Sequence, residues 1–386
     1  MDPRDLSRSA HRYRRAVMLL AGGVLTLMLT GCGIFNTVQA ARLADDEADR
    51  QAPQPLSDTV IVVAPPVMTR DVTAEAKQLA LPALFSYLVY LNHLPAAERN
   101  RPDCAVHINH HPINTLDTRS LAQGAWRRWE DALGCFSEHG LYYEVYVFRQ
   151  GKTITQAVIA VRGTENLQGQ ILGDWWNNVA VPFLGIDPTE YQYARQRIGA
   201  AIAKLRDPSE GGPDLKIYLT GHSLGGGIAQ QSAYLERVQA TYVFNTSPVT
   251  NWSNLKLDPQ LNAQMARHGT GDPKIIRVTE HGEFLDYVRW VTSRVNSRRY
   301  NRTDYLFHFT EPHWVKSHSM AVMACNFAAR LAQVPPDAQG EVGAFAYTRD
   351  MAQALLRLPA AASKDEGWCP EQSFSPEWNK QYRPAS

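Results

Sequence analysis

Hydrophobic and polar residues follow two different periodicities along most of this chain. Short runs rich in β-branched and aromatic residues predict strands, and longer stretches with apolar residues three and four positions apart predict helices. The predicted strands cover residues 59–63, 142–148, 153–161, 215–220, 241–244 and 274–279. The predicted helices cover residues 72–92, 121–133, 188–205, 227–236 and 320–331. Strands that alternate with helices in this way indicate an α/β fold with a mostly parallel sheet.

Two local patterns refine these elements. Trp126 and Trp129 stand three residues apart in the predicted helix 121–133, so both are expected to face the core. Residues 149–152 contain a glycine between two strand-like runs and predict a hairpin turn. The stretch 208–213 is rich in proline and glycine and is expected to be a loop that leads into the strand 215–220.

The most informative stretch is Gly221-His222-Ser223-Leu224-Gly225, which separates the predicted strand 215–220 from the helix that follows. A serine on such a sharp strand-to-helix turn takes strained backbone angles and needs small neighbours on both sides. Its hydroxyl would project at the carboxyl edge of the sheet, beside the free N–H groups of a helix N-terminus. Ser223 is therefore the candidate nucleophile, and the Leu224 N–H is the candidate first oxyanion donor.

A serine needs a histidine to take its proton and an acid to orient that histidine. On folds with this elbow the chain order is serine, acid, histidine. The histidines in the right part of the chain are His308, His313 and His318. His318 is preferred because it directly precedes the predicted helix 320–331, and a loop that feeds a terminal helix can deliver an imidazole to the top of the sheet.

Composition narrows the class of protein. The chain has 386 residues, 44% of them hydrophobic, and a formal net charge of +1. It is long enough to bury a full core, and its charge gives no bias toward nucleic acid. Residues 59–386 are expected to form a single α/β domain, a mostly parallel sheet flanked by helices, and no internal repeat is evident.

The first residues have a different character. Five arginines between positions 4 and 15 precede an apolar run from Ala16 to Leu29, the layout of a signal peptide. Leu29-Thr30-Gly31-Cys32 resembles the lipobox of bacterial lipoproteins, which implies a signal peptide over residues 1–31 and acylation of Cys32. Residues 32–58, with little apolar content, are expected to be a flexible tether. Gly33 after the cysteine favours the outer membrane by resemblance to enterobacterial sorting, so the domain would be lipid-anchored in the bacterial cell envelope.

Four cysteines remain in the exported part, an even number that suits an oxidising compartment: Cys104, Cys135, Cys325 and Cys369. Two disulfides are plausible, with three possible connectivities. Sequence proximity weakly prefers Cys104 with Cys135 and Cys325 with Cys369, and buried free thiols are the alternative. Cys104 and the nearby histidines match no standard zinc spacing, so no metal site is predicted.

With these residues in view, the chain resembles the class 3 lipases, the fungal-type triacylglycerol lipases of the α/β-hydrolase fold. The segments that carry the resemblance are residues 160–164, residues 220–226, the strand that ends at residues 245–248, and the late Ser317-His318 pair. The resemblance implies that Thr164, after Arg162-Gly163, supplies the second oxyanion donor. It also implies an acid six residues after Arg277, which is Glu283 where the family usually has aspartate. Asp286 is the alternative acid in the same loop, and Glu280 lies three residues earlier.

The resemblance implies a serine hydrolase that cleaves carboxylic esters of lipids, a lipase or phospholipase A, without a metal or organic cofactor. Residues 175–186 occupy the place of the family's lid, although ordinary packing of Trp175 and Trp176 explains them equally well. The arginines between positions 289 and 302 could bind phosphate headgroups or form a solvated basic face. The alternatives are an esterase, thioesterase or acyltransferase on the same site, or a non-catalytic envelope lipoprotein that retains the scaffold. The oligomeric state is left open.

Overall fold

The computed structural model describes the part of the chain that holds most of the predicted elements. The described residues are 59–62, 73–90, 125–163, 187, 189–267, 273–283, 285, 302–310, 317–337, 342–343, 345, 347–357 and 369. The predicted signal peptide, Cys32 and the tether lie outside them, as do residues 175–186 and the arginines between 289 and 299. Within the described ranges, no helix combines the length and the apolar content needed to cross a bilayer.

A single mixed sheet organises the described part of the chain. Its strand order is β1-β9-β8-β7-β6-β5-β4-β2, and β3 pairs with β4. The strands from β5 through β6, β7, β8 and β9 to β1 run parallel, whereas β4 is antiparallel to β5, β2 and β3. The bounds are β1 Thr59–Val62, β2 Ala125–Arg128, β3 Cys135–Glu138, β4 Leu141–Gln150, β5 Thr153–Val161, β6 Gly211–His222, β7 Ala240–Phe244, β8 Ile275–Glu280 and β9 Arg302–Phe307.

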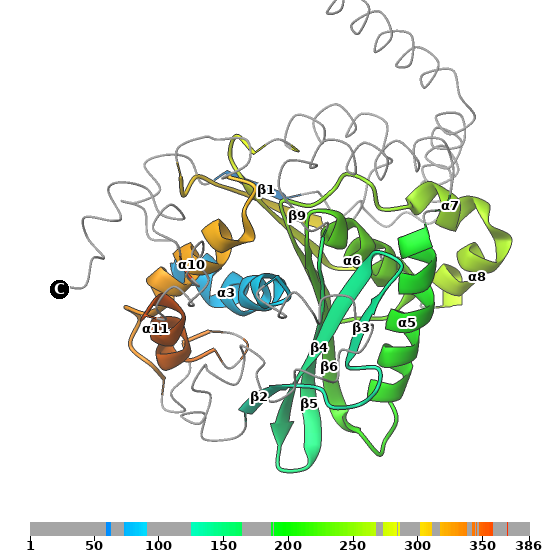
Figure 1. Cartoon of the computed structure of the whole chain (residues 1–386), viewed down its shortest axis with the longest axis horizontal. Coiled ribbons are helices and arrows are strands. Elements are labelled where there is room, and N and C mark those ends of the chain that lie inside the picture. The colour runs from blue at the N-terminus through cyan, green and yellow to red at the C-terminus, as the bar shows by residue number, and fades with distance from the viewer. Residues whose placement is uncertain are drawn as a thin grey trace, which may run out of the picture.

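Helices cover both faces of this sheet, as Figure 1 shows. One face carries α5 and α6, with α7 and α8 beyond them, and the other carries α3, α10 and α11. The bounds are α3 Thr73–Leu88, α5 Thr189–Leu205, α6 Leu224–Leu235, α7 Trp252–Leu257, α8 Pro259–Arg267, α10 Met320–Leu331 and α11 Arg349–Arg357. The predicted fold, a mostly parallel α/β-hydrolase-like sheet flanked by helices, is confirmed.

Alternation along the strands divides the core between the two faces. On β5, Ile159 and Val161 point to the α5/α6 side, whereas Val158 and Ala160 point to the α3/α10 side. Both sets are almost completely buried, as expected for a central strand covered on both faces. A side-chain hydrogen bond of 2.7 Å between Ser86 and Thr220 also docks α3 onto β6, two residues before His222.

One predicted element is wrong. Residues 121–133 were expected to form a helix, but Ala125–Arg128 is the edge strand β2, paired with β4. Trp126 and Trp129 are both buried, as predicted, but they belong to the cores on opposite faces of the sheet. A three-residue spacing marks one face of a helix and opposite faces of extended chain, so burial alone could not distinguish the two.

The other predicted elements that the structure describes are present, with altered ends. Strand β6 begins at Gly211, so the proline- and glycine-rich stretch is partly strand, and Pro213 lies within it. Helix α6 begins directly after Ser223 rather than at Gly227. Strand β9 was not predicted, because Arg302 and Asp304 on one face of Arg302–Phe307 interrupt its apolar pattern.

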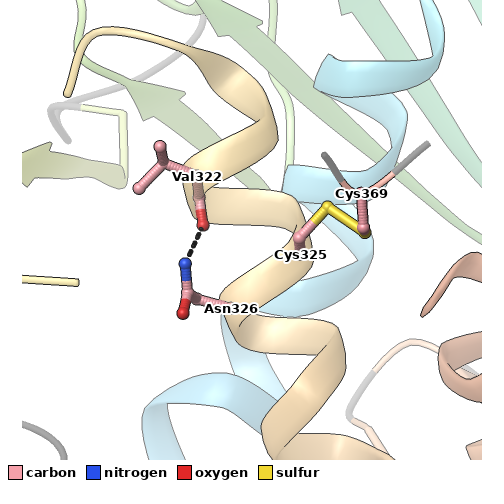
Figure 2. The surroundings of a disulfide bond; sticks show 4 residues. All are labelled: Val322, Cys325, Asn326 and Cys369. Carbon is pink, nitrogen blue, oxygen red and sulfur yellow. Dashed lines mark hydrogen bonds between the residues drawn. A yellow bond between two sulfur atoms is a disulfide. The ribbon is translucent and has the colours of Figure 1, made fainter. Parts of the chain in front are cut away.

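A disulfide between Cys325 and Cys369 ties α10 to the C-terminal part of the chain (Figure 2). The pairing predicted for these two cysteines is therefore confirmed. Cys135 is also disulfide-bonded. Its partner and Cys104 lie outside the described residues, so the pairing of Cys104 with Cys135 stays a prediction.

Candidate active site

The parallel strands end together at one edge of the sheet, and the predicted site residues follow those ends. Ser223 comes directly after β6, and Glu283 follows β8 by three residues. His318 precedes α10. The carboxyl edge of a parallel sheet is where such folds place their ligands, so this edge is the candidate active site.

Ser223 is held in a backbone conformation that few residues other than glycine adopt. Its φ is 54° and its ψ is −127°, which costs on the order of 1–3 kcal/mol unless the surroundings impose it. The surroundings do so, because the Ser223 N–H donates to Phe244 O at 3.1 Å and the Ser223 carbonyl accepts from Ser247 N–H at 2.9 Å. The residue is 8% exposed. Strain held in this way is typical of a nucleophile elbow.

The glycines around the elbow are explained by backbone contact. A Cβ at Gly221 would lie 2.4 Å from the Gly225 carbonyl oxygen. A Cβ at Gly225 would lie 2.3 Å from the Val161 carbonyl oxygen and 2.6 Å from Arg162 C. Because these neighbours are backbone atoms, they cannot move aside as a side chain can. Helix α6 therefore starts pressed against both β6 and the end of β5.

His318 and Glu283 lie against each other. His318 Nδ1 is 2.8 Å from Glu283 Oε2, and both side chains are almost fully buried, with residue exposures of 7% and 3%. The Leu285 N–H also donates to Glu283 Oε2 at 2.9 Å. A carboxylate facing Nδ1 fixes the hydrogen on that nitrogen, which leaves Nε2 as the acceptor of the neutral ring. This arrangement can orient a general base.

A buried asparagine joins the loops of these two residues. Asn245 follows β7 with a φ of 40°, and its side-chain amide donates to the Ser317 carbonyl at 3.0 Å and the His318 carbonyl at 3.4 Å. Its side-chain oxygen accepts the Glu280 N–H at 2.8 Å. Asn245 thus holds the end of β8, which leads to Glu283, against the segment that carries His318.

Glu280 is a second buried carboxyl beside Glu283. Its Oε1 accepts the backbone N–H groups of Phe309 and Thr310 at 2.7 and 2.8 Å. Its Oε2 is buried without a hydrogen-bond partner in the described part of the chain. Burial, with a smaller contribution from the nearby Glu283 carboxylate, raises the pKa of Glu280 well above its ordinary value. A raised pKa favours the neutral form of this carboxyl.

The remaining predicted residues divide into those that the structure describes and those that it does not. Leu224 is the first residue of α6, a position whose N–H has no intrahelical acceptor. His308 lies beside His281, with ring centroids 5.4 Å apart. Asp286, His313 and Thr164 lie outside the described residues, although Gly163, directly before Thr164, lies beside Ser223: a Cβ on Gly163 would be 3.0 Å from Ser223 Cβ.

Three contributors to this edge were not predicted, namely Asn245, the burial of Glu280, and Tyr90, whose hydroxyl lies 2.9 Å from His222 Nδ1. Asn245 had a sequence signal, since asparagine after a buried strand tolerates the left-handed conformation. Tyr90 had none, because nothing in the pattern places the end of α3 beside β6. Among the described residues, no three histidines, cysteines or acids lie close enough together to hold a metal ion.

Comparison with known proteins identifies a family for this chain. The family model of the Tle-like phospholipase domain, described as phospholipase-like, matches residues 83–296, more than half of the chain. No curated protein matches by sequence.

Among solved structures, the S-formylglutathione hydrolase FrmB from Staphylococcus aureus is 12% identical, with a TM-score of 0.28 over 53% of this chain and 92% of its own. The M37 lipase is 15% identical, with a TM-score of 0.31 over 52% of this chain and 67% of its own. An inhibited esterase B from Lactobacillus rhamnosis is 15% identical, with a TM-score of 0.27 over 54% and 88%. These values are low, so the fold is assigned from the strand order and the elbow. By the family match, the chain belongs to the family defined by the Tle-like phospholipase domain.

Proposed function

We propose that this protein is a serine hydrolase that cleaves carboxylic esters of phospholipids, with Ser223 as nucleophile, His318 as general base and Glu283 as the orienting acid. The observation that carries the proposal is the 2.8 Å contact between His318 Nδ1 and Glu283 Oε2 at the edge that holds the strained Ser223. Structural packing alone gives no reason to keep a serine at a φ of 54° beside such a pair.

In this mechanism, His318 Nε2 takes the proton from Ser223 Oγ as the oxygen attacks the ester carbonyl. The N–H groups of Leu224 and Thr164 donate to the carbonyl oxygen as it becomes negative. The bond to the alcohol breaks, and the imidazolium returns its proton to the departing alkoxide. Water then attacks the acyl-enzyme with the same base and releases a fatty acid. Only side chains, backbone donors and water take part.

The family match supports phospholipid as the substrate, since its model describes a phospholipase-like domain. The resemblance to class 3 lipases supports the same acyl-transfer chemistry on a neutral glyceride. A phospholipid differs from a triglyceride in its charged headgroup, so the two are separated by assay: the proposal expects release of fatty acid from phospholipid in mixed micelles to exceed release from emulsified triglyceride.

Membrane anchoring through an acylated Cys32 is part of the proposal. It would hold the domain at the surface where its substrate is found, because each buried methylene contributes about 0.8 kcal/mol to membrane binding. The expected result is that Cys32→Ala moves the protein from the membrane fraction to the soluble fraction while soluble-ester hydrolysis persists. A mutant that stays in the membrane fraction would contradict anchoring by this cysteine and leave the hydrolase proposal intact.

The direct test of the chemistry is labelling by a fluorophosphonate probe. The parent protein should be labelled on Ser223, and Ser223→Ala should lose both labelling and ester hydrolysis. Ser232→Ala is the matched control, because Ser232 is a buried serine on the same helix whose hydroxyl bonds the Ile228 carbonyl. Labelling at another residue, or equal turnover by Ser223→Ala and the parent, would reject the assignment and favour a non-catalytic scaffold.

A further inference from the structure

The residue directly before the proposed nucleophile is a second histidine that the mechanism does not use. His222 is 5% exposed, and its ring lies beside the His318 ring, with centroids 4.7 Å apart. Its Nε2 is 2.7 Å from the His318 carbonyl oxygen. Its Nδ1 is 2.9 Å from the hydroxyl of Tyr90, two residues after the end of α3. Both ring nitrogens are therefore engaged, and neither contact is to a charged group.

The Tyr90 hydroxyl has a second contact, which leads to the other side of Ser223. The Gly163 N–H donates to Tyr90 Oη at 2.8 Å. A Cβ on Gly163 would lie 2.6 Å from the His222 carbonyl oxygen, 2.8 Å from Tyr90 Oη and 3.0 Å from Ser223 Cβ. Gly163 is thus pressed against the elbow, and the next residue is the proposed oxyanion donor Thr164.

The donor and the acceptor can be assigned in each of these three hydrogen bonds. A carbonyl oxygen can only accept, so His222 Nε2 carries the hydrogen. Burial, together with the nearby His318, lowers the pKa of His222 to about 3, although the bond to the His318 carbonyl and the Glu283 carboxylate act in the opposite direction. In the neutral ring Nδ1 must accept, so Tyr90 donates its O–H to Nδ1 and accepts from Gly163.

We propose that His222 and Tyr90 are positioning residues that connect Gly163, directly before the proposed oxyanion donor Thr164, to the backbone of His318 through this one-directional series of neutral hydrogen bonds. The inference rests on the proposed function, because it assigns these hydrogen bonds a role in that reaction. Donors aimed at a developing oxyanion are effective only if they are already in place, and small displacements of catalytic groups are costly. This series of hydrogen bonds holds both Gly163 and the backbone of His318 in place relative to His222, the residue before Ser223.

The activity test compares two tyrosine-to-phenylalanine variants. Tyr90→Phe removes the donor to His222 Nδ1 and the acceptor of Gly163 N–H. Tyr218→Phe is the control, because Tyr218 is a largely buried residue on β6, the strand that carries His222, and lies outside this series of hydrogen bonds. Tyr90→Phe should lower kcat on a soluble ester, and the rate of fluorophosphonate labelling, by about tenfold, with KM changed less than about twofold. The control should leave all three unchanged.

The second test uses nitrogen chemical shifts of His222 in the parent protein and needs no variant to fold. Nδ1 should be unprotonated and Nε2 protonated, with no titration between pH 5 and 8. A His222 ring protonated on Nδ1, or one that titrates in this range, would overturn the proposal, as would equal kcat for Tyr90→Phe and Tyr218→Phe. Failure of the parent to react with the fluorophosphonate would instead reject the proposed function, which keeps the two failures distinct.

Discussion

The two faces of the sheet are assembled in different ways. The α5/α6 face is made almost entirely of one continuous region, from β4 to α8, and it carries Ser223 at the start of α6. The opposite face joins α3, near the start of the described chain, to α10 and α11, more than two hundred residues later (Figure 1). That face carries His318 and Tyr90. The proposed nucleophile thus comes from local structure and the proposed base from long-range packing.

This difference predicts how a substitution on each face should affect the candidate site. A change on the α5/α6 side disturbs the elbow itself. A change on the α3/α10/α11 side should leave the elbow formed but move the groups that act on Ser223. The edge residues Asn245 and Glu280 connect the two, since they bond to the segments around His318 and β9.

The largest expected effect comes from loss of the disulfide on the α3/α10/α11 face. The bond between Cys325 and Cys369 closes a loop of 44 residues, for which the chain-entropy model gives a stabilisation of about 4 kcal/mol. Cys369→Ala should therefore lower the free energy of unfolding by up to this amount in urea titrations. The double alanine variant should behave alike, because the effect is the lost crosslink and not the remaining thiol. Unchanged stability in both would contradict the account of this face.

Gly225→Ala should disrupt packing on the α5/α6 face, at the elbow. Its Cβ would meet the Val161 carbonyl oxygen at 2.3 Å, so we expect a loss of about 3 kcal/mol in the free energy of unfolding. Gly199→Ala is the control on the neighbouring helix α5, where a Cβ meets only the end of the Glu236 side chain at 3.2 Å. That change should be neutral or stabilising by up to about 1 kcal/mol. Similar losses in the two variants would contradict the packing described here.

Asn245→Ala tests the connection between the faces. It removes the bonds to the Ser317 carbonyl and the Glu280 N–H and places alanine at a φ of 40°, so we expect a loss of about 2–3 kcal/mol in the free energy of unfolding. It should also lower kcat. Asn245→Gly loses the same bonds without the backbone strain and should be about 1 kcal/mol more stable than the alanine variant. If both variants retain parental kcat, Asn245 does not position His318.

The smallest effect, taken over one pH unit, is a pH dependence at Glu280. Since burial raises its pKa in the folded state, the folded protein binds more protons than the unfolded chain above the ordinary glutamate pKa of about 4.3. Stability contributed by this group therefore falls as the pH rises, by at most about 1.4 kcal/mol per pH unit. Glu280→Gln should gain stability relative to the parent between pH 5 and 8. A difference that is constant with pH, or that reverses, would contradict a raised pKa of Glu280 in the folded protein.

Much of the sheet and of the α5/α6 face, together with helix α10 of the opposite face, could be predicted from the sequence. Strands β4 to β8 and helices α5 and α10 follow from periodicity, and the elbow around Ser223 follows from glycine spacing between a strand and a helix. These signals are local, because each depends on residues within one element. The same kind of signal gave the wrong element for residues 125–128, because the buried Trp126 and Trp129 fit a helix and a strand equally well.

The long-range contacts could not be predicted from such patterns. Placing Glu283 against His318 required a family spacing counted from Arg277, since 35 residues separate the two side chains in the chain. The bond between Tyr90 and His222 spans 132 residues and has no local signal. Likewise, the sequence alone does not distinguish Glu280 from the neighbouring Glu283. Glu280 is set apart by the backbone N–H groups of Phe309 and Thr310, which reach it only in the fold.

The most direct measurement of the central claim is the rate of fluorophosphonate labelling of Ser223 in the parent and in Glu283→Gln, with phospholipid hydrolysis measured alongside. The amide keeps the size of the side chain but removes the charge that faces His318 Nδ1. We expect labelling at Ser223 in the parent and a fall of about 10²-fold or more in both rates in the variant, because the histidine loses its orienting carboxylate. Equal rates in the two proteins, or no labelling of Ser223 in the parent, would contradict it.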